Sequence, residues 1–220
     1  MTNKNTWDTR PLPPAVREWA DDVSGYLTDL YAITWEKETA ARKDADWEFY
    51  QSEKSHVLDQ DDINWVIEGS ERTVVYIGRA WDGKTLFDDR AGVVVKFQSS
   101  VEATENPSAV ANRQAIETFT EICEREDGDL VSPLYSAAEN GSWIAQQYAI
   151  PINPPRTEDA APYDWIRDDP DKQLREKFKQ KCQQRGLSVN TSRGNVGVNQ
   201  AGEVVLTDIG GHTSYASKSG

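Results

Sequence analysis

The stretch of sequence that decides the fold runs from Leu187 to Gly211 and reads L-S-V-N-T-S-R-G-N-V-G-V-N-Q-A-G-E-V-V-L-T-D-I-G-G. It contains two short apolar runs, Val196 to Val198 and Val204 to Leu206, separated by the turn signal Asn199-Gln200-Ala201-Gly202. Apolar runs joined by a glycine-containing turn are typical of a β-hairpin. The stretch therefore predicts an antiparallel hairpin over residues 196–206.

Two polar residues flank this predicted hairpin. Asn195 directly precedes its first strand, and Asp208 follows its second strand. An antiparallel hairpin brings the start of one strand next to the end of the other, so we expect both side chains at one edge. Amide and carboxylate oxygens are ligands for Mg²⁺. The edge is therefore a candidate magnesium site.

The segment resembles the catalytic loop and the metal-binding D-F-G segment of the protein-kinase-like superfamily, in particular its small, divergent microbial and viral members. Asp208-Ile209-Gly210 stands where D-F-G would. In that family the loop Asn and the D-F-G Asp hold the magnesium ions that bridge nucleotide phosphates. The resemblance thus implies ATP and Mg²⁺ as cofactors and gives the metal roles to Asn195 and Asp208.

The sequence departs from the family pattern at one catalytic position. Five residues before the metal-binding Asn, the family has the Asp that accepts the proton of the substrate hydroxyl, and this chain has Asn190. An amide cannot act as that base. The resemblance implies a pseudokinase, that is, a nucleotide-binding or regulatory module, with a weakly active ATP-dependent phosphotransferase of a protein or small molecule as the alternative.

Five runs of β-branched and aromatic residues predict an antiparallel sheet upstream of the hairpin. A predicted helix from Ser108 to Glu124 separates the third strand from the fourth. By resemblance this is a kinase-like N-lobe with one helix, in an α+β fold. The predicted strands are Trp65–Ile67, Thr73–Ile77, Gly92–Phe97, Leu130–Tyr135 and Trp143–Tyr148.

Lys96 lies near the end of the third predicted strand, in the run Gly92-Val93-Val94-Val95-Lys96-Phe97. Burying an ammonium group without a partner is expensive, so a Lys there points to a charged partner or lies at a solvent-facing edge. The run resembles the V-A-I-K strand of kinases, whose Lys pairs with nucleotide phosphates and with a helix Glu. Glu117 is the candidate for that Glu, and a register with Ala115 in its place stays open.

Two further nucleotide contacts are implied by the resemblance alone. The turn that contains Gly69 and Ser70 would lie over the phosphates as the Gly-rich loop. It has a single glycine, and an ordinary hairpin turn explains it nearly as well. The backbone near Gln147 and Tyr148 would form hydrogen bonds with the adenine edge.

Residues 1–62 predict a helical N-terminal extension that packs on the outside of the main domain. A first helix follows the Pro-Leu-Pro-Pro run at residues 11–14, and a second is predicted from Thr34 to Tyr50. The apolar positions at helical spacing in the first helix are Val16, Trp19, Ala20, Val23, Tyr26, Leu27 and Leu30.

The remaining sequence divides into two predicted parts, a kinase-like N-lobe over residues 63–150 and a truncated C-lobe over residues 151–220. The C-lobe contains a charged helix from Asp171 to Arg185 and then the metal-binding hairpin. Leu174, Phe178 and Cys182 recur at helical spacing and predict the buried face of that helix. No A-P-E segment follows, so we expect no peptide-binding lobe of the ordinary kinase type.

Composition indicates a globular, cytoplasmic protein. Of its 220 residues 37% are hydrophobic, which is enough for a core. No apolar run reaches the roughly 18 residues of a membrane helix, and the N-terminus lacks an apolar signal-peptide core. We therefore expect no membrane partner. Cys123 and Cys182 have no metal-binding spacing and are interpreted as buried, reduced thiols.

The charge excludes one class of partner. The formal net charge of −13 argues against a nucleic-acid binder, because phosphate contacts need clustered Lys and Arg. A high-salt or simply acidic cytosolic source accounts for this charge. A protein partner stays open, and with it a second alternative function: an acidic interaction protein on a kinase-like scaffold that binds no nucleotide.

Overall fold

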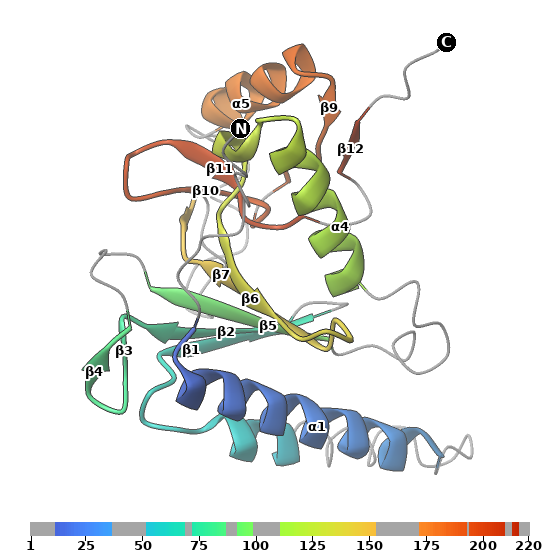
Figure 1. Ribbon diagram of the computed structural model, residues 1–220, viewed down its shortest axis with the longest axis vertical. Helices are drawn as coiled ribbons and strands as arrows, with labels where there is room; N and C mark the ends of the chain where they lie inside the picture. The colour runs from blue at the N-terminus through green and yellow to red at the C-terminus, as the bar shows by residue number, and fades with distance from the viewer. Residues whose placement is uncertain are drawn as a thin grey trace, which may run out of the picture. The chain divides into compact units, whose positions relative to one another are not determined.

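The computed structural model of the chain has an α+β fold with antiparallel sheets, as the sequence predicted (Figure 1). The chain forms two compact units. The sheet unit contains helix α1 and strands β1 to β7, and the hairpin unit contains α5, strands β8 to β12 and α4 from Gln114 onward. The described residues are 12–36, 52–68, 72–86, 92–98, 111–152, 172–192, 194–209 and 213–215.

Five antiparallel strands form the main sheet of the sheet unit, as predicted. The strand predicted at Leu130–Tyr135 begins only at Leu134, and Gly128–Leu130 forms a short 3-10 helix. The hydrogen-bonded order is β1-β2-β5-β7-β6, so β5 is the central strand. The strands span Trp65–Glu68 (β1), Arg72–Gly78 (β2), Val93–Gln98 (β5), Leu134–Ala137 (β6) and Trp143–Gln147 (β7). Helix α4, Ala111–Glu124, follows β5 and precedes β6 in the chain.

A small hairpin that we did not predict lies between β2 and β5. Strands β3, Ala80–Trp81, and β4, Lys84–Thr85, pair across a two-residue turn. Both turn residues have positive φ, 50° at Asp82 and 68° at Gly83. This backbone is that of a type I′ turn, which favours Asp-Gly pairs. The Asp82-Gly83 pair was therefore the signal for this hairpin.

Helix α1 spans Pro14–Glu36 and begins where the proline run ends. Pro14 occupies the first helical position, where its fixed φ is favourable and its missing N–H needs no partner. The carbonyl of Pro13 accepts hydrogen bonds from the amides of Val16 at 3.0 Å and Arg17 at 3.2 Å. The helix continues to Glu36, past the start of the second predicted helix. Residues 37–50 of that prediction lie outside the described part of the chain.

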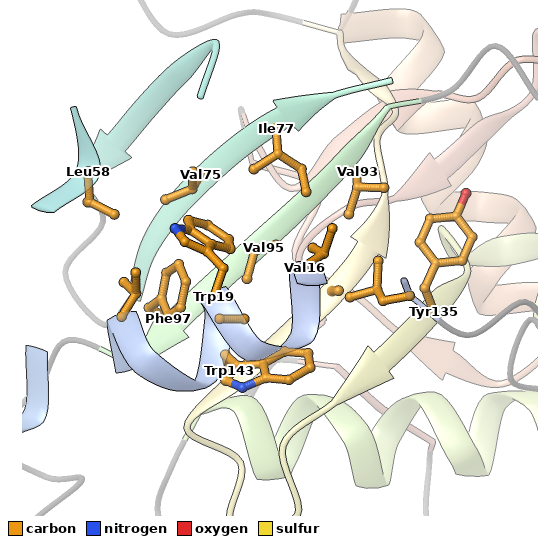
Figure 2. Close-up of a cluster of buried hydrophobic side chains, with 14 of the residues drawn as sticks. Val16, Trp19, Leu58, Val75, Ile77, Val93, Val95, Phe97, Tyr135 and Trp143 are labelled. Atoms are coloured by element: carbon orange, nitrogen blue, oxygen red, sulfur yellow. The ribbon is translucent and has the colours of Figure 1, made fainter. Parts of the chain in front are cut away.

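The apolar stripe of α1 and one face of the main sheet form the core of the sheet unit (Figure 2). Trp19 packs against Phe97 with ring centroids 5.5 Å apart and against Trp81 at 4.8 Å. The N-terminal helix is thus part of this unit, and the boundary predicted at residue 62 falls inside it. The core includes Val16, Trp19, Ala20, Val23 and Leu27 from α1 and Val75, Ile77, Val93, Val95, Phe97, Tyr135, Trp143 and Ala145 from the sheet.

Strand β5 is buried on both of its faces. Val93, Val95 and Phe97 belong to the core shared with α1. Side chains alternate along a strand, so Val94 and Lys96 lie on the opposite face, and both are buried as well. The central position and 6% exposure of Lys96 exclude the alternative of a solvent-facing edge lysine.

The hairpin unit contains the predicted β-hairpin. Strands β10, Val196–Val198, and β11, Val204–Leu206, pair antiparallel with Val196 opposite Leu206. Strand β8, Ile150–Pro151, adds to the other edge of β10. A second ladder joins β9, Leu187–Ser188, to β12, Ser214–Tyr215.

Helix α5 spans Lys172–Gln184, within the predicted range. Phe178 and Cys182 are buried as expected, whereas Leu174 is 39% exposed and was wrongly assigned to the same face. Cys182 and Cys123 are buried and form no disulfide, as predicted. Burial raises the pKa of the Cys182 thiol to about 11.

Gly92, just before β5, packs closely against strand β2. A Cβ there would lie 2.7 Å from the carbonyl oxygen of Gly78 and would overlap the Tyr76 ring. We expect Gly92→Ala to lower the free energy of unfolding by about 1–3 kcal/mol, the usual effect of overpacking. Urea denaturation measures this change.

The matched control is Gly25→Ala in α1. A Cβ at Gly25 has no heavy atom within 4 Å, and Ala is favoured over Gly in a helix by about 1 kcal/mol. Gly25→Ala should therefore raise stability. Equal effects of the two substitutions would contradict the close contact at Gly92.

Candidate functional site

The candidate site is the loop between β9 and β10 together with the end of β11, all in the hairpin unit. Its central contact is made by the carbonyl oxygen of Asn195. This oxygen accepts hydrogen bonds from the backbone N–H of Thr207 at 2.9 Å and of Asp208 at 3.4 Å. The structure therefore brings the two candidate metal ligands, Asn195 and Asp208, to the same edge of the hairpin. Both side chains are partly exposed.

The loop before Asn195 is held by local hydrogen bonds. The Oδ1 atom of Asn190 accepts the backbone N–H of Ser192 at 2.9 Å, and the Nδ2 atom of Asn195 donates to the carbonyl of Asn190 at 3.4 Å. The Thr207 hydroxyl donates to the carbonyl of Gly194 at 2.8 Å, where the backbone has a φ of 89° that favours glycine. Asn190, Asn195 and Asp208 thus form one cluster.

Gly197 permits the strands of the hairpin to pack closely. A Cβ at this position would lie 2.8 Å from Cγ2 of Thr207, 3.0 Å from Cβ of Ala149 and 3.0 Å from the carbonyl oxygen of Ile150. Only glycine fits this space without a shift of the backbone. The glycine in the Val-Gly-Val sequence of β10 is therefore required by this close packing.

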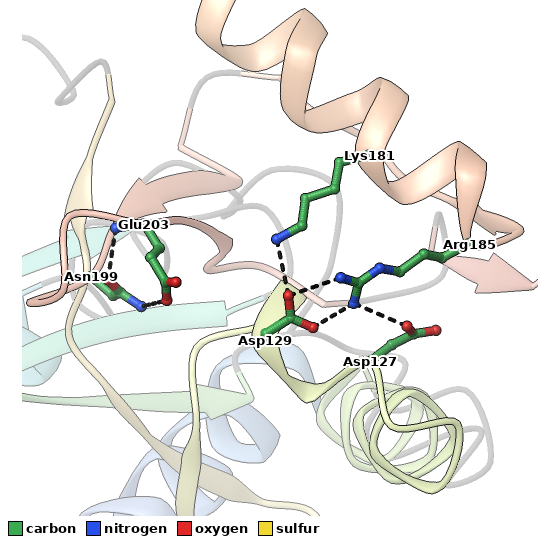
Figure 3. A network of polar contacts seen from close by, with 6 residues as sticks. All are labelled: Asp127, Asp129, Lys181, Arg185, Asn199 and Glu203. Atoms are coloured by element: carbon green, nitrogen blue, oxygen red, sulfur yellow. Dashed lines mark hydrogen bonds and ion pairs between the residues drawn. The ribbon is translucent and has the colours of Figure 1, made fainter.

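An ion-pair cluster in the hairpin unit connects α5 to the short 3-10 helix η2, Gly128–Leu130 (Figure 3). The Arg185 guanidinium forms a two-pronged ion pair with Asp129 and a further one with Asp127 at 3.1 Å. Lys181 Nζ lies 2.9 Å from the same Asp129 carboxylate. We did not predict this cluster. Its only signal was two basic residues four positions apart near the end of a predicted helix.

The same cluster holds strand β12. The Tyr215 hydroxyl donates to Oδ2 of Asp127 at 2.7 Å, and the Arg125 guanidinium stacks 3.9 Å from the centre of the Tyr215 ring. Strand β9 precedes the loop that contains Asn190, and β12 follows the segment that contains Asp208. The β9–β12 ladder therefore joins the chain before the candidate loop to the chain after Asp208.

The charges of the cluster shift its ionisation equilibria. Partial burial opposes ionisation of Asp129, but the hydrogen bonds from Arg185 and Lys181 outweigh this effect and lower the pKa of the carboxyl. Burial, followed by the hydrogen bond to Asp127, raises the pKa of Tyr215 far above its usual range. Both groups therefore keep their ionisation state throughout the neutral pH range.

The other predicted site residues are distributed over both units. Lys96 lies in the sheet unit, and its carbonyl accepts a hydrogen bond of 3.0 Å from the buried Asn112 side chain. Glu117 is exposed on α4, whereas Ala115 is on the buried side of that helix. The exposure of Glu117 does not favour it as the partner of a buried lysine, and the pairing stays a prediction.

The remaining predicted nucleotide contacts are less defined. Gln147 ends β7 opposite Val93, and Tyr148 follows it, with both side chains partly exposed. Gly69 and Ser70 lie outside the described residues, so the predicted Gly-rich loop stays a prediction. Among the residues with described positions, no group of three or more His, Cys, Asp or Glu side chains could share a metal ion.

Comparison with known proteins finds no protein family and no curated protein that matches this chain. Within the described segments, none of the helices combines the length and the hydropathy needed to cross a membrane. The functional assignment therefore depends on the geometry of the site and on the resemblance of its motifs.

The ion pairs of Asp129 make a pH-dependent contribution to stability. Its pKa is lowered in the folded state, so this contribution is present above the usual value of 3.8 and is lost as the pH falls through the folded pKa. Solvent screens these partly exposed charges, so we expect Asp129→Asn to cost about 0.5 kcal/mol at pH 7. The difference from the unmodified chain should begin to shrink only when the pH falls below the usual value of 3.8. Urea denaturation as a function of pH measures it.

The matched control is Asp22→Asn, which removes an exposed carboxylate of α1. Asp22 has no ion pair within the described chain, so the free energy of unfolding should change little at any pH. No difference between Asp129→Asn and the unmodified chain at pH 7 would show that its ion pairs do not stabilise the fold.

Proposed function

We propose that the chain is a kinase-fold protein that binds ATP together with Mg²⁺ and acts as a binding or regulatory module. The observation that carries the proposal is the pairing at Asn195, whose carbonyl accepts the backbone amides of Thr207 and Asp208. This backbone pairing makes Asn195 and Asp208 neighbours at the base of a hairpin. The resemblance to the loop Asn and the D-F-G Asp of kinases assigns Mg²⁺ to that pair.

The chemistry of the two side chains fits Mg²⁺ that is bound with a nucleotide. Mg²⁺ keeps several waters and is usually bound through one or two carboxylates plus substrate phosphates. Asn195 and Asp208 offer one amide oxygen and one carboxylate, which is too few for a cation held by protein groups alone. Phosphate oxygens would complete the coordination, so we expect metal binding to require the nucleotide.

The order of elements in the chain also supports the proposal. Three strands, a helix and two strands succeed one another as β1, β2, β5, α4, β6 and β7, which is the order that the resemblance implies. Lys96 lies on the third of these main strands, as the lysine of a V-A-I-K strand would. A buried ammonium needs polar partners, and the resemblance assigns it to the nucleotide phosphates.

The amide at Asn190 favours binding over catalysis. Its Oδ1 atom already accepts the Ser192 amide, and an amide cannot take a proton from a substrate hydroxyl. The Asn195 side chain contacts the Asn190 carbonyl, which links the two residues within the loop. General-base catalysis contributes about 10²–10⁴ to a rate, so its loss need not abolish phosphoryl transfer. A weakly active phosphotransferase is therefore the alternative function.

Asp208→Asn tests the nucleotide site. We expect ATP with Mg²⁺ at about 100 times its Kd to stabilise the unmodified chain by about 2.7 kcal/mol. The stabilisation should require Mg²⁺ and should be lost in Asp208→Asn, because the substitution removes the carboxylate ligand. Thermal unfolding in KCl, with and without ATP and Mg²⁺, measures the shift.

Glu203→Gln is the matched control. Glu203 lies at the turn of the same hairpin, where it contacts Asn199 at 3.3 Å, and its substitution also removes one negative charge. The ATP-dependent shift should persist in this variant. No shift in the unmodified chain would contradict the proposal and favour an acidic interaction protein that binds no nucleotide.

Asn190→Asp separates the binding module from the weak phosphotransferase. If the chain is a binding module, restoring the carboxylate should leave ATP turnover at background, measured as phosphate or ADP release. A gain of about 10²-fold or more would instead show an intact active site that lacks only its base. The double variant with Asp208→Asn must abolish any such gain if it arises at this site.

A further inference from the structure

A groove of about 640 Å³ follows helix α1 in the sheet unit. One wall is a polar stripe of α1 that includes Asp21, Ser24 and Gly25, and the other is the turn between β6 and β7 around Glu139. Ligand-binding clefts are typically about 300–1,000 Å³ in volume. The groove is large enough for a ligand and takes no part in the proposed nucleotide site.

The charged side chains of the groove have an excess of negative charge. Asp21, Asp29 and Glu139 line it together with a single cation, Arg17. Within the described part of the chain, none of these four side chains forms an ion pair. The groove therefore presents uncompensated carboxylates to a ligand, and a cationic ligand is complementary to it.

Both walls of the groove are held in place before any ligand arrives. The indole Nε1 of Trp143 donates to Oδ1 of Asp21 at 2.7 Å, and the Trp143 ring is anchored in the core (Figure 2). On the turn, Arg113 Nε donates to the carbonyl of Asn140 at 3.0 Å, next to Glu139. Pre-organised groups lose little conformational freedom on binding, which favours affinity.

A largely buried serine lines the groove between the acidic side chains. Ser24 is only 7% exposed and lines the groove, and its hydroxyl has no hydrogen-bond partner among the described residues. Gly25 beside it has no heavy atom within 4 Å of where a Cβ would lie, so a side chain at position 25 would have room there.

We propose that this groove binds an extended, arginine-bearing segment of a partner protein. The planar guanidinium group pairs with carboxylates through two parallel hydrogen bonds, and its remaining N–H groups can donate to a hydroxyl such as that of Ser24. Arginine is also enriched in protein interfaces relative to lysine.

The spacing of the carboxylates sets the spacing of the arginines. Asp21 and Asp29 are separated by about 12 Å along the helix axis, at about 1.5 Å per residue. An extended chain covers this distance in about four residues at about 3.3 Å each, and residues four apart point to the same side. The partner segment is therefore of the form Arg-x-x-x-Arg.

The probe is the capped, fluorescently labelled peptide Arg-Ser-Gly-Ser-Arg, with fluorescence anisotropy measured on the full chain. At about 0.15 M salt the Debye length is about 8 Å, so long-range attraction to the acidic chain is largely screened. The double variant Asp21→Asn with Asp29→Asn should weaken binding about tenfold or more. Asn retains an oxygen that can accept from Trp143, so the fold should be preserved.

The matched control is Glu18→Gln with Asp22→Asn. These two residues are exposed on the same helix, are not part of the groove and give the same change in charge. Binding should change less than about twofold in this control. Equal weakening in both double variants would show non-specific attraction and overturn the proposal, as would no binding at about 1 mM peptide.

Two further measurements address the shape of the site. Gly25→Gln places a side chain in the groove while improving helix propensity, so it should abolish binding without unfolding the chain. The peptide Arg-Arg-Ser-Gly-Ser has the same charge with adjacent arginines and should bind several-fold more weakly. Unchanged binding in Gly25→Gln, or equal affinity for the two peptides, would contradict a spaced site in this groove.

Discussion

The hairpin unit depends on one close approach of the backbone, at the carbonyl of Asn195. This oxygen accepts two amides from the end of β11, and the neighbouring Gly197 leaves no room for a side chain between β10, β8 and Thr207. A hydrogen-bonded hairpin of this kind fixes the distance between the residues at its base. Any function of Asn195 and Asp208 as a pair follows from that constraint.

The sheet unit depends on a different constraint, the burial of β5 on both faces. One face packs on α1 through Phe97 and its neighbours, and the other carries Lys96. A lysine on a central, buried strand is expensive unless polar groups compensate it. The same burial anchors Trp143, whose indole N–H reaches out of the core to orient Asp21 on α1. Core packing thus positions polar groups at the surface.

Short-range patterns predicted most of the elements but not all of their environments. Runs of β-branched and aromatic residues predicted the five strands, the fourth with displaced bounds, and the Asn199-to-Gly202 turn predicted the hairpin. Backbone geometry at these positions depends on adjacent residues. Leu174 is a position where helical spacing predicted burial wrongly. Its helical spacing matched Phe178 and Cys182, yet it is exposed, because burial depends on which element covers a face and not on the spacing alone.

The sequence by itself determined the hairpin, the sheet strands, the amide at Asn190 and the positions of Asn195 and Asp208 along the chain, because these follow from local residue order. Only the tertiary structure decided that α1 forms the core of the sheet unit, that Arg185 joins Asp127 and Asp129, and that Trp143 orients Asp21. Trp143 and Asp21 are 122 residues apart in the chain. Contacts over such separations arise from the packing of whole elements, and no local pattern in the sequence predicts them.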